Sequence, residues 1–268
     1  MARRSRLAWI IGVTGGLIGG LFGLPPIPQS LAYHAFADTR PMLGVPNFLN
    51  VASNAAFLLV GGAGFVTVCR AGRTRDIIFA GSSERWPYAL LFLSVTLTGL
   101  GSAYYHLAPD NARLVWDRLP MAVAFAALFS AVVTERFDGA VGAALLAPLV
   151  AASVASVLYW HITEAAGHGD LRPYIVVQFY PVLAIPLIMY LFPSRYSRGG
   201  DLLAAAALYA VAKGFEALDA MIFALGRIVS GHTLKHLAAA AAVALIIRML
   251  QIRRLVPAGE NVFSAAAR

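Results

Sequence analysis

Long apolar segments recur along the whole chain, and short stretches rich in glycine, proline or charge separate them. A helix needs ~20 mostly apolar residues to cross a bilayer. None of these segments alternates with the two-residue period of a strand. The pattern therefore predicts an all-α, polytopic membrane helix bundle with a seven-helix core and one additional N-terminal span. The eight predicted spans are roughly 7–24, 48–68, 87–106, 119–134, 141–160, 174–192, 202–224 and 232–252.

Composition supports this class. Hydrophobic residues make up 59% of the chain and charged residues 13%, whereas about a quarter of a soluble domain is charged. The net charge of +8 raises the question of nucleic acid, but the basic residues are scattered and form no stripe interleaved with aromatics. We predict no nucleic-acid partner and no obligate protein partner. The single Cys69 excludes an intrachain disulfide framework and any cysteine-based zinc site.

The arginines predict an orientation. With the N-terminus in the cytoplasm, 14 arginines fall in cytoplasmic segments and 5 in outer ones, which matches the positive-inside rule. Both termini are then cytoplasmic. Residues 1–32 form a retained transmembrane anchor or, in the alternative, a signal peptide cleaved near Ala32. The seven-helix membrane domain covers 33–256, and 257–268 form a cytoplasmic tail.

Five polar residues converge in this topology. Ser102 and His106 are spaced i, i+4 near the outer end of the third span, and Asp117 stands near the start of the fourth. His232 and His236 have the same spacing at the start of the last span. Each residue alone has an ordinary explanation as an interfacial histidine, a backbone-bonded serine or a helix cap. Their common depth near the non-cytoplasmic face favours a functional site.

Three imidazoles at one depth are typical of a catalytic zinc site with a fourth position left for water. Zinc lowers the pKa of its bound water and polarises a substrate carbonyl. Asp117 would exchange protons with water and the leaving group as general acid/base. The Ser102 hydroxyl would donate a hydrogen bond to the developing oxyanion.

Two more acids lie in the seventh predicted span. Glu216 and Asp219 are placed toward its outer half, near the proposed metal. A carboxylate that accepts the free N–H of a zinc-bound histidine fixes its tautomer, so both are hypothesised to support the metal ligands. The alternative for Glu216 is an ion pair with Lys213, three residues earlier.

The same motifs resemble the alkaline ceramidase family, within the CREST superfamily of membrane hydrolases. The resemblance spans roughly 33–252 and implies that His106, His232 and His236 hold zinc, with Asp117 as acid/base and Ser102 beside the metal. It implies hydrolysis of a ceramide-like lipid amide to a fatty acid and a sphingoid base. The motifs are 46–54 (PNFLNVASN), 101–106 (GSAYYH), 117–121 (DRLPM) and 232–236 (HTLKH).

Three further points qualify the resemblance. Eukaryotic ceramidases resemble one another in an acidic N-terminal calcium site, but here that region offers Asp38 and Asn47 and no glutamate, so calcium is not predicted. A membrane receptor or transporter that uses the histidine–aspartate cluster for ligand or proton binding is the alternative function. A b-type cytochrome fits poorly, because two of the histidines share one helix.

Overall fold

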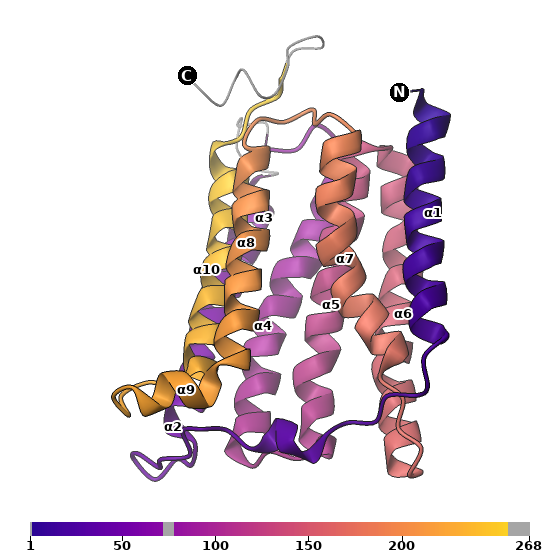
Figure 1. The fold of residues 1–268 in the computed structure, drawn as a ribbon. Coiled ribbons are helices and arrows are strands. Elements are labelled where there is room, and N and C mark those ends of the chain that lie inside the picture. The colour runs from indigo at the N-terminus through magenta and orange to yellow at the C-terminus, as the bar shows by residue number, and fades with distance from the viewer. Residues whose placement is uncertain (1, 72–77, 257–268) are drawn as a thin grey trace.

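The computed structural model describes residues 2–71 and 78–256, and the described chain is helical apart from loops and isolated bridges. Figure 1 shows a bundle of long, roughly parallel helices, which confirms the predicted all-α fold. The long helices are α1 (Arg3–Phe22), α3 (Ala55–Ala71), α4 (Arg85–Leu107), α5 (Asn111–Arg136), α6 (Gly139–Ala165), α7 (Arg172–Leu191), α8 (Gly199–Ala217) and α10 (Gly231–Ile252). The short ones are η1 (Leu31–His34), α2 (Phe48–Ala52), η2 (Ser82–Glu84) and α9 (Asp219–Ala224).

Within the described residues, seven helical segments are long and apolar enough to cross a membrane, with α2 and α3 counted as one. Helix α8 is outside this set because it carries Asp201, Lys213 and Glu216. It nevertheless runs beside α10 along the height of the bundle (Figure 1). The protein is thus a multi-pass membrane protein in which one helix of the bundle is more polar than the others.

Helix α5 forms the centre of the bundle and is the most buried of the candidate spans. It packs against α4, α6 and α7, while α8 packs on α10 and α3 packs on α4 and α10. Helix α1 stands at the edge beside α7 and has no buried residue (Figure 1). Helices α7 and α8 barely touch each other.

One predicted span is divided in the structure. The apolar segment 202–224 does not form one helix, because α8 ends at Ala217 and α9 begins at Asp219 after a non-helical Leu218. The Asp219 carboxylate accepts hydrogen bonds from the backbone N–H groups of Ala37 and His232. The break places this carboxylate at a helix start, where it can receive both donors.

Another helix begins earlier than predicted. Helix α5 starts at Asn111, where the polar segment 107–116 suggested a loop, because Asp110 caps it by accepting from the Arg113 backbone N–H at 2.7 Å. Asp117 therefore lies inside the helix, about two turns from its start, with Pro120 following it. Asp117 still lies toward the end of the bundle that holds His236, with which it lines a cavity.

Residues 25–46 cross the end of the bundle where α2 and α9 lie (Figure 1). The Leu171 N–H donates to the Ile27 carbonyl, and the Gln29 N–H donates to the Glu164 carboxylate. These bonds fasten the crossing segment to the connection between α6 and α7.

We expect Asp170, in that connection, to make stability depend on pH. Its buried carboxylate pairs with Arg172 at 2.8 Å, and this guanidinium lowers the pKa of Asp170 to about 2. A carboxylate whose pKa is lowered in the folded state stabilises the fold at pH values above its pKa in the unfolded chain, near ~4. This stabilisation is lost as the pH falls toward 2. The melting temperature of Asp170→Asn should be lower than wild type at pH 7, and the difference should shrink between pH 4 and 2. A difference that stays constant over this range would contradict the assignment, and Arg172→Gln should behave like Asp170→Asn.

Candidate metal centre

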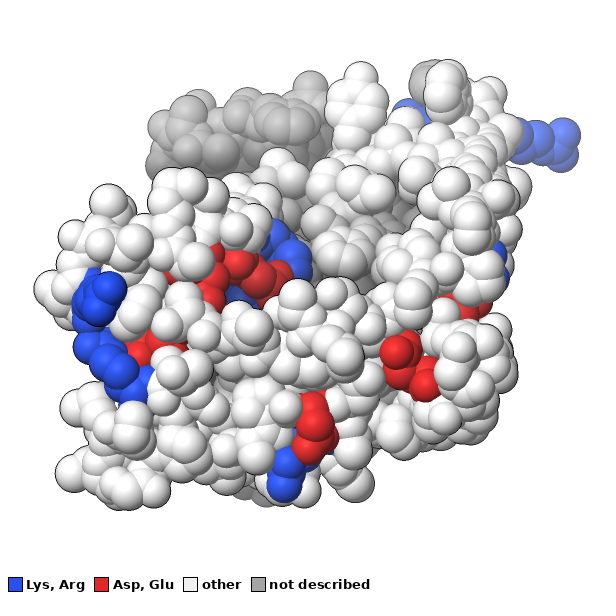
Figure 2. All heavy atoms as spheres, turned by 60° about the horizontal axis from the view of Figure 1, so that its bottom comes forward, with Lys and Arg blue, Asp and Glu red and all other residues white. Residues whose placement is uncertain are grey.

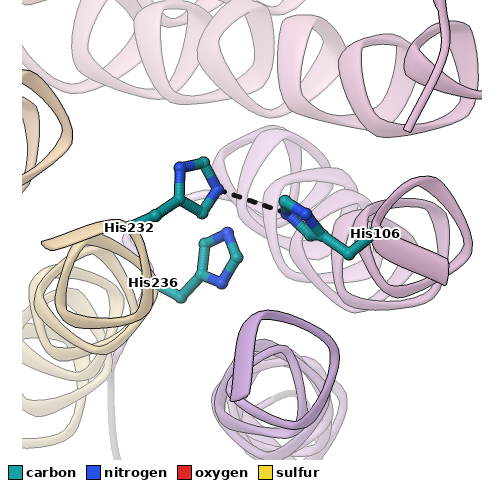
Figure 3. A group of neighbouring side chains, drawn as sticks. All are labelled: His106, His232 and His236. Carbon is teal, nitrogen blue, oxygen red and sulfur yellow. Dashed lines mark hydrogen bonds between the residues drawn. The ribbon is translucent and has the colours of Figure 1, made fainter. Parts of the chain in front are cut away.

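Three histidines meet between the end of α4 and the start of α10 (Figure 3). His106 lies in the last turn of α4, and His232 and His236 lie one above the other in the first turns of α10. One ring nitrogen from each comes within 4.8 Å of the others, and all three side chains are buried. The predicted convergence is confirmed, and the group could hold a metal ion.

The orientation of the rings fits a metal. The His232 and His106 Nε2 atoms are 3.3 Å apart. Two ligands with bonds of ~2.0–2.1 Å at a tetrahedral zinc stand about 3.3 Å apart. The His236 Nδ1 bonds the Ser53 hydroxyl at 2.7 Å, which leaves its Nε2 for the shared centre. Among the described residues, the buried His106 Nδ1 has no hydrogen-bond partner.

Aromatic and loop residues close this group off from water. The ring of Phe36, in the segment that crosses the bundle end, lies 4.7 Å from the His106 ring and 4.4 Å from the His232 ring, centroid to centroid. Phe36 is itself buried. Ser53 reaches His236 from the break between α2 and α3. The three rings are thus enclosed largely by protein, where electrostatic interactions are stronger than in water.

Ser102 and Asp117 lie beside the histidines. Ser102 is one helical turn before His106, and α4 approaches α5 so closely at Gly101 that a Cβ there would overlap the Trp116 carbonyl. Ser102 and Asp117 are both buried and line the same cavity as His236. The structure therefore brings the two proposed catalytic side chains to the metal group from two different helices.

The two supporting acids have other partners than the imidazole rings. Glu216 pairs with Lys213, as the alternative interpretation expected, and with Lys235 at 2.5 Å. Asp219 accepts the backbone N–H of His232 at 2.7 Å rather than its ring. Among the described residues neither carboxylate hydrogen-bonds an imidazole ring, and the Ser53 hydroxyl bonds the Nδ1 of His236. The supporting role of Glu216 and Asp219 stays a prediction.

Asp38 and Asn47, the two residues considered above as calcium ligands, both have partners within the protein. Asp38 pairs with Arg40 at 2.8 Å, and hydrogen bonds from this guanidinium lower the pKa of the Asp38 carboxyl. Asn47 donates to the His106 carbonyl oxygen at 2.8 Å. These contacts hold the crossing segment over the end of α4.

A cavity of about 450 Å³ opens beside the metal group. It lies mainly among α5, α7, α8 and α10 and is lined largely by apolar side chains. Along α10 its lining runs from Lys235 to Ile246, a depth of about 16 Å at 1.5 Å per residue. Its polar end contains Ser102, Asp117 and His236, so the cavity joins an apolar interior to the candidate chemistry.

Several residues of this site could not be recognised from the chain alone. Phe36 and Ser53 lie far from the histidines in sequence, and single residues of these types occur throughout the protein. Arg118 and Lys235 lie inside the motifs 117–121 and 232–236 and also line the cavity. The motifs drew attention to these positions, but they did not show that the two side chains face the cavity.

Comparison with known proteins gives no family. No family model and no curated protein matched the chain. The resemblance to alkaline ceramidases therefore stays a prediction, and the function is argued from the site.

We expect His106→Ala to lose the bound metal while the protein remains folded. Removing a ligand should weaken metal binding by more than the ~10–100-fold cost typical of a partner in the outer shell. Metal analysis of purified protein measures this, with His168→Ala in the exposed connection after α6 as the control. Equal metal content in wild type and His106→Ala would refute the assignment.

Gly101→Ala should separate α4 from α5 at Asp117. The added methyl group overlaps the Trp116 carbonyl, and such overpacking typically costs about 1–3 kcal/mol. Gly62→Ala is the matched control, because no heavy atom lies within 4 Å of its added Cβ. Thermal unfolding should show a loss for Gly101→Ala only; equal stability of the two variants would contradict the close contact.

Proposed function

We propose that this protein is a zinc-dependent intramembrane amidase that cleaves a ceramide-like lipid amide, as its resemblance to alkaline ceramidases implies. The observation that carries the proposal is the position of Ser102 and Asp117 at the junction of an apolar cavity and a buried three-histidine group. A soluble substrate would not need a cavity of this depth and apolarity. The acyl chain of a lipid amide would match the apolar cavity, and its amide group would match the polar end beside the histidines.

Zinc is proposed from the donors. Three buried imidazoles, two of which hold their Nε2 atoms 3.3 Å apart as at a tetrahedral zinc, suit a catalytic site that keeps one position open. Zinc bound there would supply Lewis-acid polarisation of the amide carbonyl and would activate water for attack. His106, His232 and His236 would hold it, and Ser53 would orient His236 through its Nδ1.

The chain's own groups then move protons and orient the substrate. Asp117 accepts a proton from the attacking water and later donates it to the nitrogen of the departing amine. Ser102 donates a hydrogen bond to the carbonyl oxygen as negative charge develops on it. Phe36 and the segment around it exclude bulk water, so both interactions act in a medium of low dielectric.

The cavity would hold the acyl chain. Its apolar wall continues along α10 away from the metal group, so the amide comes to rest at the polar end. Sparse contact between α7 and α8, which both line the cavity, provides a lateral route from the bilayer. With both termini in the cytoplasm, the site lies near the non-cytoplasmic face, and the products are a fatty acid and the freed amine.

Asp117→Asn should abolish most amide hydrolysis and retain the metal. Loss of a general acid/base typically costs about 10²–10⁴-fold in rate. Mass spectrometry of the fatty acid released from ceramide by purified protein measures the rate, and metal analysis runs in parallel.

Asp110→Asn is the control on the same helix, because asparagine also caps a helix start. It should keep the wild-type rate. Wild-type protein that contains zinc and releases no fatty acid from any lipid amide would overturn the enzymatic proposal and favour a receptor or transporter.

A further inference from the structure

Arg118 is a buried cation at the polar end of the cavity. The residue is 5% exposed and lines the cavity together with Asp117. Its Nη2 donates to the Gln29 Oε1 at 2.5 Å, whereas its buried Nη1 has no hydrogen-bond partner among the described residues. A buried guanidinium donor without an acceptor costs folding free energy. This nitrogen therefore indicates that a ligand supplies the acceptor.

The surroundings of Arg118 hold it in place and leave its charge unpaired. The guanidinium lies over the rings of Trp160 at 4.2 Å, Tyr174 at 4.8 Å and Tyr33 at 5.5 Å. Stacking on aromatic faces orients a guanidinium and partly offsets its desolvation. None of these partners is an anion. The guanidinium is therefore held in a fixed orientation, as in a ligand-binding site, and is not part of a structural ion pair.

The other charged residues lining the cavity do not neutralise Arg118. Glu216 is shared by Lys213 and Lys235, and Asp117 forms no salt bridge with Arg118 although both line the cavity. Three basic and two acidic side chains line the cavity in total. Figure 2 brings this end of the bundle forward and shows charged side chains in small mixed patches on a mostly uncharged face. The cavity therefore has an excess of positive charge that suits an anionic group.

The crossing segment places Gln29 against Arg118. Gln29 is buried, and its own N–H donates to Glu164 at 2.9 Å. Gln29 engages one hydrogen of Nη2, and Nη1 is the buried guanidinium nitrogen that has no hydrogen-bond partner among the described residues. Tyr33 and Gln29 line the cavity beside Arg118, so the three residues together form one side of its polar end.

We propose that the amine half of the substrate carries a carboxylate that Arg118 binds, so that the substrates are N-acyl amino acid lipids. This inference rests on the proposed amidase activity toward a lipid amide, and it replaces the sphingoid base of a ceramide by an amino acid as the amine half. Water adds to the acyl carbon, the C–N bond breaks, and a proton moves to the nitrogen, which gives a fatty acid and a free amino acid. A hydroxylated sphingoid base offers Arg118 no anion, whereas a carboxylate supplies the missing acceptor.

The first experiment compares two lipids that share one acyl chain. Purified protein in detergent is given N-oleoylglycine, which is anionic, and N-oleoylethanolamine, which is neutral. Wild-type protein should prefer N-oleoylglycine in kcat/KM by about 10- to 100-fold, the value of a hydrogen bond to a charged group. Equal kcat/KM for the two lipids would overturn the inference and leave the amidase proposal intact.

The second experiment changes the cation. Arg118→Gln should raise KM for N-oleoylglycine by a similar factor with little change for N-oleoylethanolamine, and Arg118→Lys should restore part of the preference. Arg113→Gln, on the same helix and outside the cavity, is the control. Unchanged preference in folded Arg118→Gln protein would also overturn the inference.

Binding separates failure of the inference from failure of the amidase proposal. In Asp117→Asn protein, N-oleoylglycine should raise the melting temperature more than N-oleoylethanolamine or oleate does, and Arg118→Gln should remove this advantage. This result would stand even if no amide were hydrolysed. If oleate stabilised the protein as strongly and with the same dependence on Arg118, the residue would bind the acyl acid and the assignment to the amine half would be wrong.

Discussion

Burial of polar groups inside an apolar bundle is the constraint on which the rest of this structure depends. At the end of the bundle away from the histidines, charged side chains are paired: Glu135 with Arg253, and Glu84 with Arg195 and Tyr196. At the histidine end, two buried nitrogens remain without a partner among the described residues, one on His106 and one on Arg118. In a low-dielectric interior an unsatisfied polar atom is expensive. The Tyr88 hydroxyl beside Arg253 is also without a partner, but the other three such atoms, on Asn54, His106 and Arg118, lie toward the histidine end.

Close helix contacts give that half its geometry. Gly101 lets α4 approach α5 at Asp117, and Gly231 lets the start of α10 lie against the Phe215 carbonyl. Side chains at either glycine would push apart the helices that hold His106, Asp117 and His232. Small residues at helix crossings thus set the separation of the reactive groups, which are held by rigid elements rather than by loops.

The segment that crosses the bundle end connects the metal group and the Arg118 subsite. Phe36 covers the histidine rings, while Gln29 fixes one side of the guanidinium. Hydrogen bonds to the α6–α7 connection, and from Arg40 to the carbonyl oxygens of Arg227 and Ile228, fasten this segment at several points. One stretch of chain therefore covers the histidine rings and also lines the cavity beside Arg118, where the amine half of the proposed substrate would lie.

The sequence by itself determined the helical class, the approximate spans and the depth shared by His106, His232 and His236, because apolar length and positive charge act locally and read directly from the chain. It also indicated the Lys213–Glu216 pair, which is a contact within one helix turn. It could not determine the break at Leu218, the early start of α5 or the ring partner Ser53, which lies between α2 and α3. It could not show which way the Arg118 side chain points, and it could not show the cavity. Those features depend on how distant helices approach one another, and only the tertiary structure decides which buried donor finds an acceptor and which is left for a ligand.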